Sequence, residues 1–515
     1  MKISKTTVRI ILLLSILIIS NFIWLKLDTQ PPHWDFAVHL SYSMNYLDSL
    51  KNFDLKQFFL GYSYWPPLTY YITDLFFLIF GINERVAVLS LTPFLVIMVV
   101  SIFKLGDLLG GKKLGWLSLI VLIGIPSLMS QAREYLLDLP LTAMFMLNTY
   151  LFLKSDFFSN QKYSVLFGIT SGLGLLTKWS YGIFLAGFFL LIGLRFLKKT
   201  KQENWINLMT VLFFIASISG PWYSSNFFTR KDILLRQIIE AIKERGEPIF
   251  SVGSSLYFYH FYSLYFVHFR FPLTVFLVIG LAYLLFNLKK NVKTGLVLFV
   301  ASFYFAVLSV YPIKDPRYVE PITPLLVIII SLWVVKIKGK LLRRFLLTAL
   351  IGVSIFNYIS STFGIRQIPE TLEFNIFNKP ILFYQQKGYT QGPPVQEDWR
   401  ISKLVKKIAQ DIKISAENKT SARVIALIHK DKMFYNKYTF GYYARLYFPR
   451  TVQLQTFELK NRDCQDVYQS YPDYLIINLE TLSSLQQCLK YFKDYEEIGN
   501  NILPDKTRVV SLKLK

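Results

Sequence analysis

The sequence predicts a polytopic α-helical membrane protein with about 11 spans and an extracytoplasmic α/β domain at its C-terminus. Three observations predict this class. The 515 residues are 53% hydrophobic and 17% aromatic, with a mean hydropathy of +0.37, which is too apolar for a soluble enzyme. Apolar runs of roughly span length recur from residue 10 to residue 361. Residues 362–515, in contrast, are polar and alternate the patterns of short strands and helices.

Eleven apolar segments have roughly the length that a membrane span needs, about 17–25 residues. They are residues 10–27, 85–105, 114–132, 136–153, 163–177, 179–197, 205–222, 270–288, 294–311, 318–335 and 345–361. The apolar run 67–81 is short, contains Asp74 and follows two prolines, so we expect it to lie along the outer surface. No small-residue cleavage site follows the basic N-terminus, which predicts a retained first span rather than a cleaved signal peptide.

The net charge of +24 comes from basic clusters between the apolar segments. Every second loop is basic, as the positive-inside rule requires of cytoplasmic loops in a plasma-membrane protein whose N-terminus is cytoplasmic. These loops hold Lys104, Lys112 and Lys113; Lys154 and Lys162; Arg195, Lys198, Lys199 and Lys201; Lys289, Lys290 and Lys293; and Lys336, Lys338, Lys340, Arg343 and Arg344. The charge therefore reports membrane topology, and we expect no nucleic-acid partner.

The predicted domains are a transmembrane domain, residues 1–361, and an extracytoplasmic α/β domain, residues 362–515. Strands are predicted over Arg423–Ile428, Thr451–Leu459, Tyr474–Leu479 and Val509–Leu514, and helices over Trp399–Ile412 and Leu482–Phe492. Cys464 and Cys488 can pair if this domain faces an oxidising compartment, although two cysteines are no disulfide framework. Asn418-Lys419-Thr420 matches a glycosylation sequon.

The stretch PPHWDFAVHLSYSMNY, residues 31–46, follows the first span and carries the first candidate site residues. If it is helical, Asp35, His39, Tyr42 and Tyr46 share one face by three-and-four spacing. Asp35 is then either a helix cap or a carboxylate presented beside the lipid. His39 has metal-ligand spacing from Asp35, but a lone pair favours hydrogen bonding, and we expect no metal.

Asp138, in QAREYLLDLPL, is the second candidate acid and lies at the outer end of a span. An ionisable residue at the membrane boundary is costly unless it is used or paired, and Arg133 is the available partner. A snorkelling salt bridge between them is the structural alternative. If Asp35 and Asp138 line one cavity, one is a general base and the other orients the acceptor or the base.

Basic and aromatic residues of the outer loops are candidates for substrate binding. Lys178 in GLGLLTKWSYG and Arg317 in KDPRYVEP lie at interface depth and, with Arg133, suit the phosphate of an anionic lipid. Topology and snorkelling are the alternatives for these cations. Trp65 belongs to the aromatic loop GYSYWPPLTYY, which fits an interfacial aromatic belt or sugar stacking.

The motifs WDFAVH, YWPPLTYY, REYLLDLPL, GLGLLTKWSYG, GPWY and KDPRYVEP, in that order, resemble the GT-C glycosyltransferases over roughly residues 9 to 335. The nearest resemblance is to the dolichyl-phosphate-mannose protein mannosyltransferases and the lipid A aminoarabinose transferases. It implies a polyprenyl-phosphate sugar donor and transfer with inversion on the outer face. By this resemblance Asp35 is the catalytic carboxylate, Asp138 is the second acid, and Lys178, Arg317 and Tyr318 bind substrate.

The sequence departs from the family pattern at two positions. Phe36 follows Asp35 where many relatives carry an acidic pair. Trp65 stands where the aminoarabinose transferases have a lysine, so the lipid phosphate must rely on other cations.

The chemistry that the resemblance implies is sugar transfer to a hydroxyl of a protein, a lipid or a glycan. A lipid-linked sugar phosphate is already activated, and the protein has to align donor and acceptor, deprotonate one hydroxyl and neutralise the departing phosphate. No nucleotide-phosphate loop is present, so no nucleotide sugar and no cofactor are expected. The alternatives are a lipid-linked substrate transporter or flippase, disfavoured because no repeated halves are visible, and a scaffold. The sequence leaves the sugar and the acceptor open.

Overall fold

A computed structural model of the chain describes residues 4–61, 63–197, 201–228, 239, 258–311, 313–376, 379–386, 391–415, 423–429, 433–448, 452–458, 472–479, 492–506 and 508–515. The chain forms two units. Unit 1 comprises Met1–Leu25 and Tyr46–Pro394, and unit 2 comprises Lys26–Asn45 and Val395–Lys515. This division differs from the predicted domain boundary at residue 361, and it assigns the first half of the Asp35 helix to the second unit.

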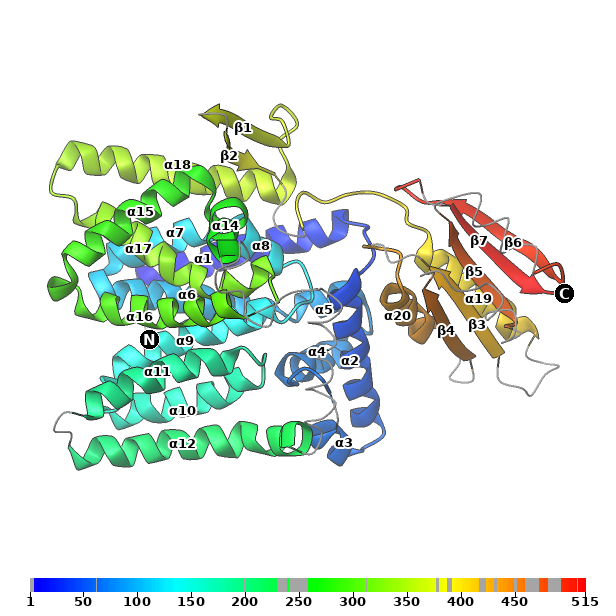
Figure 1. The fold of residues 1–515 in the computed structure, drawn as a ribbon, viewed down its shortest axis with the longest axis horizontal. Coiled ribbons are helices and arrows are strands. Elements are labelled where there is room, and N and C mark those ends of the chain that lie inside the picture. The colour runs from blue at the N-terminus through cyan, green and yellow to red at the C-terminus, as the bar shows by residue number, and fades with distance from the viewer. Residues whose placement is uncertain are drawn as a thin grey trace. The chain divides into compact units, whose positions relative to one another are not determined.

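Unit 1 is a helical bundle (Figure 1), and each of the eleven predicted spans is helical. Its helices are α1 (Lys5–Leu27), the end of α2 (Trp34–Lys51), α3 (Leu55–Leu60), α4 (Leu68–Phe80), α5 (Glu84–Leu89), α6 (Thr92–Gly110), α7 (Lys112–Ile123), α8 (Pro126–Gln131), α9 (Asp138–Ser155), α10 (Gln161–Leu175), α11 (Tyr181–Phe196), α12 (Gln202–Tyr223), α14 (Tyr259–Ser263), α15 (Arg270–Phe286), α16 (Val292–Val310), α17 (Thr323–Lys336) and α18 (Lys340–Phe363). Shorter π- and 3₁₀-helical turns are η1 (Ser224–Phe228), η3 (Leu264–Phe269), η4 (Leu288–Lys290) and η5 (Pro316–Ile322).

Seven helical segments of the described chain are long and apolar enough to cross a membrane, which makes this a multi-pass membrane protein. They are Lys5–Leu27, Glu84–Gly110, Gln202–Asn226, Tyr259–Phe286, Val292–Val310, Pro316–Lys336 and Lys340–Phe363. The number is smaller than the eleven predicted partly because α7, α10 and α11 have only 12, 15 and 16 residues. The apolar run after Pro67 forms the 13-residue α4, which ends at Gly81 with a φ of 82°.

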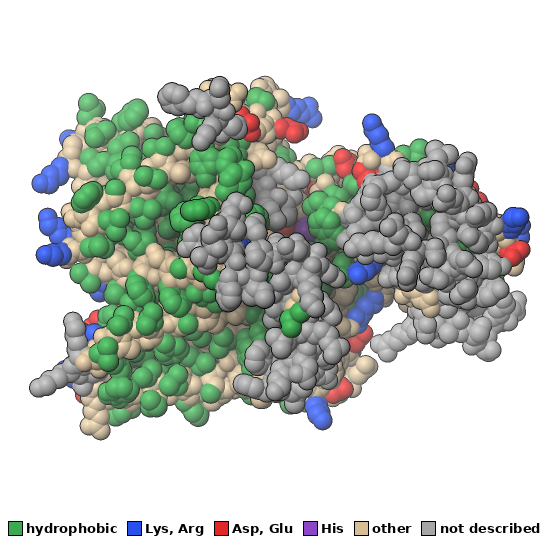
Figure 2. All heavy atoms as spheres, in the orientation of Figure 1, with side chains coloured by type: hydrophobic (Ala, Val, Ile, Leu, Met, Phe, Trp, Pro, Cys, Tyr) green, Lys and Arg blue, Asp and Glu red, His purple; other side chains and the backbone are tan. Residues whose placement is uncertain are grey.

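The core of unit 1 lies around α17, because 89% of an 18-residue apolar window within Pro316–Lys336 is buried. This helix packs against α7, α15 and α16, and its run of Leu, Ile and Val side chains is apolar on all sides, as a central helix requires. Other spans expose large apolar side chains, including Leu341 and Phe286 at 83% and 89% exposure. Figure 2 shows hydrophobic side chains covering the sides of the bundle. Such a surface suits contact with lipid.

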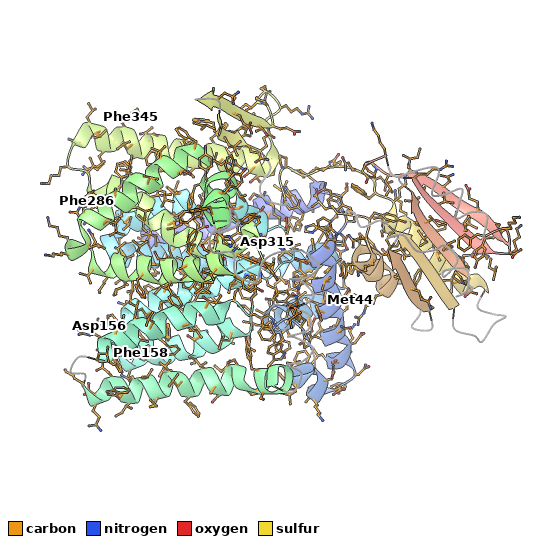
Figure 3. All side chains as sticks on the ribbon, viewed as in Figure 1. Met44, Asp156, Phe158, Phe286, Asp315 and Phe345 are labelled. Atoms are coloured by element: carbon orange, nitrogen blue, oxygen red, sulfur yellow. The ribbon has the colours of Figure 1, made fainter. Side chains whose placement is uncertain are left out.

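Figure 2 shows Lys and Arg side chains at the left end of the bundle. Asp156, Phe158, Phe286 and Phe345 lie at that end in Figure 3, and Asp315 lies toward the other. The basic connections thus share one end, as the alternation of charge predicts.

A small β-hairpin that the sequence did not predict follows α18 in unit 1. Strands β1 (Thr371–Ile376) and β2 (Lys379–Gln385) pair antiparallel, and β2 packs on α15. Its register shifts between Leu372 and Glu373, which marks a bulge.

Unit 2 contains a five-stranded sheet in the order β4-β3-β5-β7-β6. Its strands are β3 (Arg423–His429), β4 (Val452–Glu458), β5 (Tyr474–Leu479), β6 (Tyr495–Ile502) and β7 (Arg508–Leu514), and its helices are α19 (Ile401–Ser415) and α20 (Lys437–Tyr447). Strands β4, β3 and β5 are parallel, whereas β7 pairs antiparallel with β5 and β6. The α/β class, the four predicted strands and the helix from Trp399 are confirmed, whereas β6 and α20 were not predicted.

Several predictions for this unit lie outside the described residues. They are the pairing of Cys464 with Cys488, the sequon at Asn418 and most of the helix over Leu482–Phe492.

Candidate functional site

An ion pair between Lys178 and Asp138 is the centre of the candidate site in unit 1. Asp138 is the first residue of α9, where a carboxylate is favoured by the helix dipole. Lys178 lies in the turn between α10 and α11, and its Nζ is 2.6 Å from Asp138 Oδ1. Their side chains are only 11% and 3% exposed. The sequence predicted both residues for the site but did not predict that they pair.

Two aromatic rings flank the ammonium group of Lys178. The Lys178 Nζ lies 5.7 Å from the centroid of the Trp65 ring and 5.8 Å from that of the Tyr318 ring, within cation–π range. Three candidate residues from three separate segments, Asp138, Trp65 and Tyr318, therefore meet around the ammonium group of a fourth, Lys178. The structure thus brings Lys178 to Trp65, the position at which the resemblance implies a lysine.

The loop that carries Trp65 is fixed by hydrogen bonds to its neighbours. Ser63 Oγ donates to the Trp65 carbonyl at 2.6 Å, and Trp179 Nε1 donates to the Tyr64 carbonyl at 2.7 Å. Leu68 N, at the start of α4, donates to the Leu176 carbonyl at 2.9 Å. Because Trp179 directly follows Lys178, these hydrogen bonds hold the Trp65 ring close to the Lys178 ammonium group.

The loop between α16 and η5 is tied at both ends by charged side chains. Lys314 Nζ donates to the carbonyls of Leu308 and Ser309 at 3.1 and 2.8 Å, which satisfies acceptors at the C-terminal end of α16. Asp315 caps η5 by accepting from Arg317 N at 2.8 Å. The Arg317 guanidinium also binds Asp315 through both oxygens, at 3.1 and 2.8 Å. The positive charge of Arg317 is therefore balanced within its own turn.

Two further acids that the sequence analysis missed belong to this region. Glu134 and Glu320 are 0% and 1% exposed. Glu320 interacts electrostatically with Asp138, Glu134, Arg317 and Asp315. The sequence signal that could have identified Glu320 is an acid at the entry to an apolar span, as in KDPRYVEP.

Arg133 has other partners than the predicted one. Its guanidinium donates to Asn21 Oδ1 on α1 at 3.2 Å, and to Thr362 Oγ1 and the Ser361 carbonyl on α18 at 2.6 and 3.4 Å. It also lies 5.6 Å from the Trp24 ring, and burial lowers its pKa to about 10. The expectation that Arg133 pairs with Asp138 is wrong, because Lys178 occupies that carboxylate. The geometry favours a structural role over the predicted phosphate contact.

A second buried acid of unit 1, Asp74, lies on α4 beneath the aromatic loop. It is 0% exposed, and among the described residues neither of its carboxyl oxygens has a hydrogen-bond partner. Burial and repulsion from Asp48 raise its pKa to about 9. At neutral pH this carboxyl is therefore protonated.

Asp35 and His39 lie in unit 2, on the first half of α2. Asp35 is in the first turn of the helix, where its charge faces the helix N-terminus. Helix α20 fixes this segment, since Thr439 Oγ1 donates to the Pro32 carbonyl at 2.8 Å and Arg445 Nη1 donates to the Ser41 carbonyl at 3.1 Å. Over the described ranges, no group of three or more His, Cys, Asp or Glu residues is arranged to hold a metal ion.

Comparison with known proteins gives a partial match to a family model and a shared fold. Residues 65–223, which include Trp65, Asp138 and Lys178, match the family model "Dolichyl-phosphate-mannose-protein mannosyltransferase". An uncharacterized protein of Aquifex aeolicus (strain VF5) is 28% identical over 276 residues, which is 51% of this chain and 52% of that protein. The chain thus spans about half the length of this curated relative.

Two solved structures share the fold over nearly the whole chain. ArnT from Cupriavidus metallidurans bound to undecaprenyl phosphate matches with a TM-score of 0.60 at 12% identity, covering 98% of each chain. Its apo state matches with a TM-score of 0.58 at 13% identity, covering 99% of this chain and 98% of ArnT. The resemblance predicted from the motifs is confirmed: the chain has the GT-C glycosyltransferase fold, and its residues 65–223 match the dolichyl-phosphate-mannose-protein mannosyltransferase model.

Proposed function

We propose that the chain is an integral membrane glycosyltransferase that moves a sugar from a polyprenyl-phosphate donor to a hydroxyl acceptor on the outer face of the membrane. The observation that carries the proposal is the buried Lys178–Asp138 pair between the rings of Trp65 and Tyr318. A cation held at a fixed point beside stacking surfaces suits a phosphate with a sugar attached. The structural relative was solved with undecaprenyl phosphate bound, which supports this class of donor.

In the proposed reaction an acceptor oxygen attacks the anomeric carbon while the bond from that carbon to the phosphate oxygen breaks. The acceptor proton passes to Asp35, and the departing phosphate keeps the bonding electrons. Attack from the side opposite the phosphate inverts the anomeric centre. The phosphate is a stable leaving anion, so the protein contributes a base, alignment and compensation of charge.

Lys178 compensates the phosphate charge while Asp138 holds Lys178 in place. An ammonium group has three N–H donors, so it can keep its 2.6 Å contact with Asp138 and donate to a phosphate oxygen as well. Asp138 is then a positioning residue for the cation. Arg317 is a second phosphate ligand, and because Asp315 engages it through two bonds, it has to share that carboxylate with the phosphate.

The proposal includes a topology in which the basic loops and the N-terminus are cytoplasmic. Lys178 and Arg317 then face the outer leaflet, where a lipid-linked donor presents its phosphate. Cysteine labelling from outside intact cells tests this orientation, since Ser180→Cys should be labelled by a membrane-impermeant reagent and Ser159→Cys should not. Labelling of Ser159→Cys alone would contradict the proposal.

The substitution Asp35→Asn tests the catalytic assignment. We expect sugar transfer to fall by about 10²–10⁴-fold, the usual contribution of a general base, while membrane insertion and binding of undecaprenyl phosphate persist. Asp48→Asn is the matched control, because it makes the same change on the same helix outside the proposed machinery. Unchanged transfer by Asp35→Asn would remove Asp35 from the mechanism. Lipid movement across the bilayer with no sugar transfer by the wild type would favour a flippase instead.

A further inference from the structure

Glu320 is a buried acid for which the proposed reaction has no role. It is 1% exposed, and in the described part of the chain its Oε1 atom has no hydrogen-bond partner. Leaving a polar atom buried and unpaired costs free energy, and the cost is larger for a charged group. Such a group calls for an explanation, and a partner supplied by a ligand is one.

The position of Glu320 ties it to the candidate site. It lies on η5, a 3₁₀-helix that packs against α9, the helix that begins with Asp138. In a 3₁₀-helix residues three apart lie on the same face, so Glu320 shares a face with Arg317. Its electrostatic interactions with Asp138, Arg317 and Asp315 agree with this placement.

The cations of this region are engaged by other acids. Lys178 pairs with Asp138 at 2.6 Å, and Arg317 pairs with Asp315 at 2.8 Å. Within the described residues Glu320 takes part in no ion pair. A further carboxyl group beside the phosphate-binding cations supplies no positive charge to the phosphate, so we expect it to face a different part of the ligand. In a sugar phosphate, that part is the sugar, which is one bond away from the phosphate oxygen.

We propose that Glu320 is a specificity-determining residue that accepts a hydrogen bond from an O–H or N–H group of the donor sugar. Carboxylate oxygens are strong acceptors for such groups, and a site built to pair them discriminates against sugars that lack them. The enclosed position of Glu320 favours the donor sugar over a bulky acceptor. This inference rests on the proposed function, since it assumes that a polyprenyl-phosphate sugar occupies the site.

The test compares the purified full-length wild type with Glu320→Gln and Glu320→Met. The Gln side chain keeps a carbonyl acceptor but has no charge. The Met side chain has about the same length but has neither the acceptor nor the charge. The probes are undecaprenyl phosphate, undecaprenyl phosphate-linked neutral hexoses and an undecaprenyl phosphate-linked amino sugar. Affinity is measured by native mass spectrometry or fluorescence titration, and thermal unfolding is recorded for each protein.

We expect Glu320→Met to bind the preferred sugar-bearing carrier about 10- to 100-fold more weakly and bare undecaprenyl phosphate as the wild type does. If the sugar group is a hydroxyl, Glu320→Gln retains most of the affinity, and if it is an ammonium, both variants lose it. Both variants should also unfold at a higher temperature, because an unpaired buried carboxyl is removed. A purely structural carboxyl would instead lower the unfolding temperature in both.

Each remaining outcome has a defined meaning. Equal affinity of all three proteins for every sugar-bearing carrier would overturn the role of Glu320 and leave the proposed function intact. Equal losses for bare and sugar-bearing carriers would overturn the sugar contact, because the effect would then lie with the phosphate. Failure of the wild type to bind any of these carriers would overturn the proposed function together with this inference.

Discussion

The ion pair of Lys178 with Asp138 gives the strongest quantitative prediction, because its geometry and its burial are both defined. Breaking a buried ion pair by removing one partner costs about 3–5 kcal/mol, since the other charge stays buried and unpaired. Lys178→Met also removes the two cation–π contacts with Trp65 and Tyr318, each worth about 0.5–2 kcal/mol. It leaves Asp138 near a second carboxyl group, that of Glu320. We therefore expect Lys178→Met to cost about 4–9 kcal/mol.

Asp138→Asn should cost less, about 1–3 kcal/mol, because the ammonium keeps both rings and the amide keeps an acceptor. The double variant should cost less than the sum of the two single variants, by a coupling energy of about 1–3 kcal/mol. The assay is unfolding in mixed micelles, followed by tryptophan fluorescence and fitted for the free energy of unfolding.

The exposed pair Lys403–Asp398 of unit 2 is a matched control, because its Nζ–Oδ2 distance is also 2.6 Å while its side chains are 76% and 50% exposed. Lys403→Met should cost less than about 1 kcal/mol, as surface pairs do. The reasoning is refuted if the costs at Lys178 and Asp138 simply add. It is refuted as well if Lys403→Met costs as much as Lys178→Met, since burial would then not be the cause.

Two further predictions concern buried charged groups of unit 1. The pKa of Asp74 is raised in the folded protein, so the folded state binds more protons than the unfolded state between about pH 4 and pH 9. The contribution of Asp74 to the free energy of unfolding is therefore greatest below about pH 4 and falls as the pH rises toward about 9. The slope of this decline is at most about 1.4 kcal/mol per pH unit, and Asp74→Asn should flatten it. If the pH profile of thermal unfolding is the same in the wild type and in Asp74→Asn, Asp74 ionises normally. Arg133→Met should lower the free energy of unfolding by about 2–4 kcal/mol, because hydrogen bonds to α1 and α18 are lost, with no change in the affinity for undecaprenyl phosphate. Weaker lipid binding at unchanged stability would restore Arg133 as a phosphate ligand.

The architecture of unit 1 was largely predictable from the sequence, since burial in lipid requires long apolar helices and leaves few alternatives. Each of the eleven apolar segments is helical, and the run 67–81 forms the short α4. In unit 2 the alternating patterns predicted β3, β4, β5 and β7, because one face of each strand has to be apolar. The strand β6, with the sequence YEEIGNNI, was not predicted because its polar residues break that alternation. The hairpin β1–β2 was missed as well, although TLEFNI and KPILFYQ carry apolar residues.

The sequence named Trp65, Asp138, Lys178 and Tyr318 as candidate site residues but did not predict the contacts among them. Residue order and charge alternation predicted Arg133, Lys178 and Arg317 in outer loops, and sequence proximity suggested Arg133 as the partner of Asp138. Arg133 is nearer to Asp138 in the sequence, yet Asp138 pairs with Lys178. Packing brings the α10–α11 turn, which carries Lys178, to the start of α9. Arg133 instead points toward α1 and α18. Which charges pair depends on the distances between side chains of different helices, and the spacing of residues along the sequence does not give these distances.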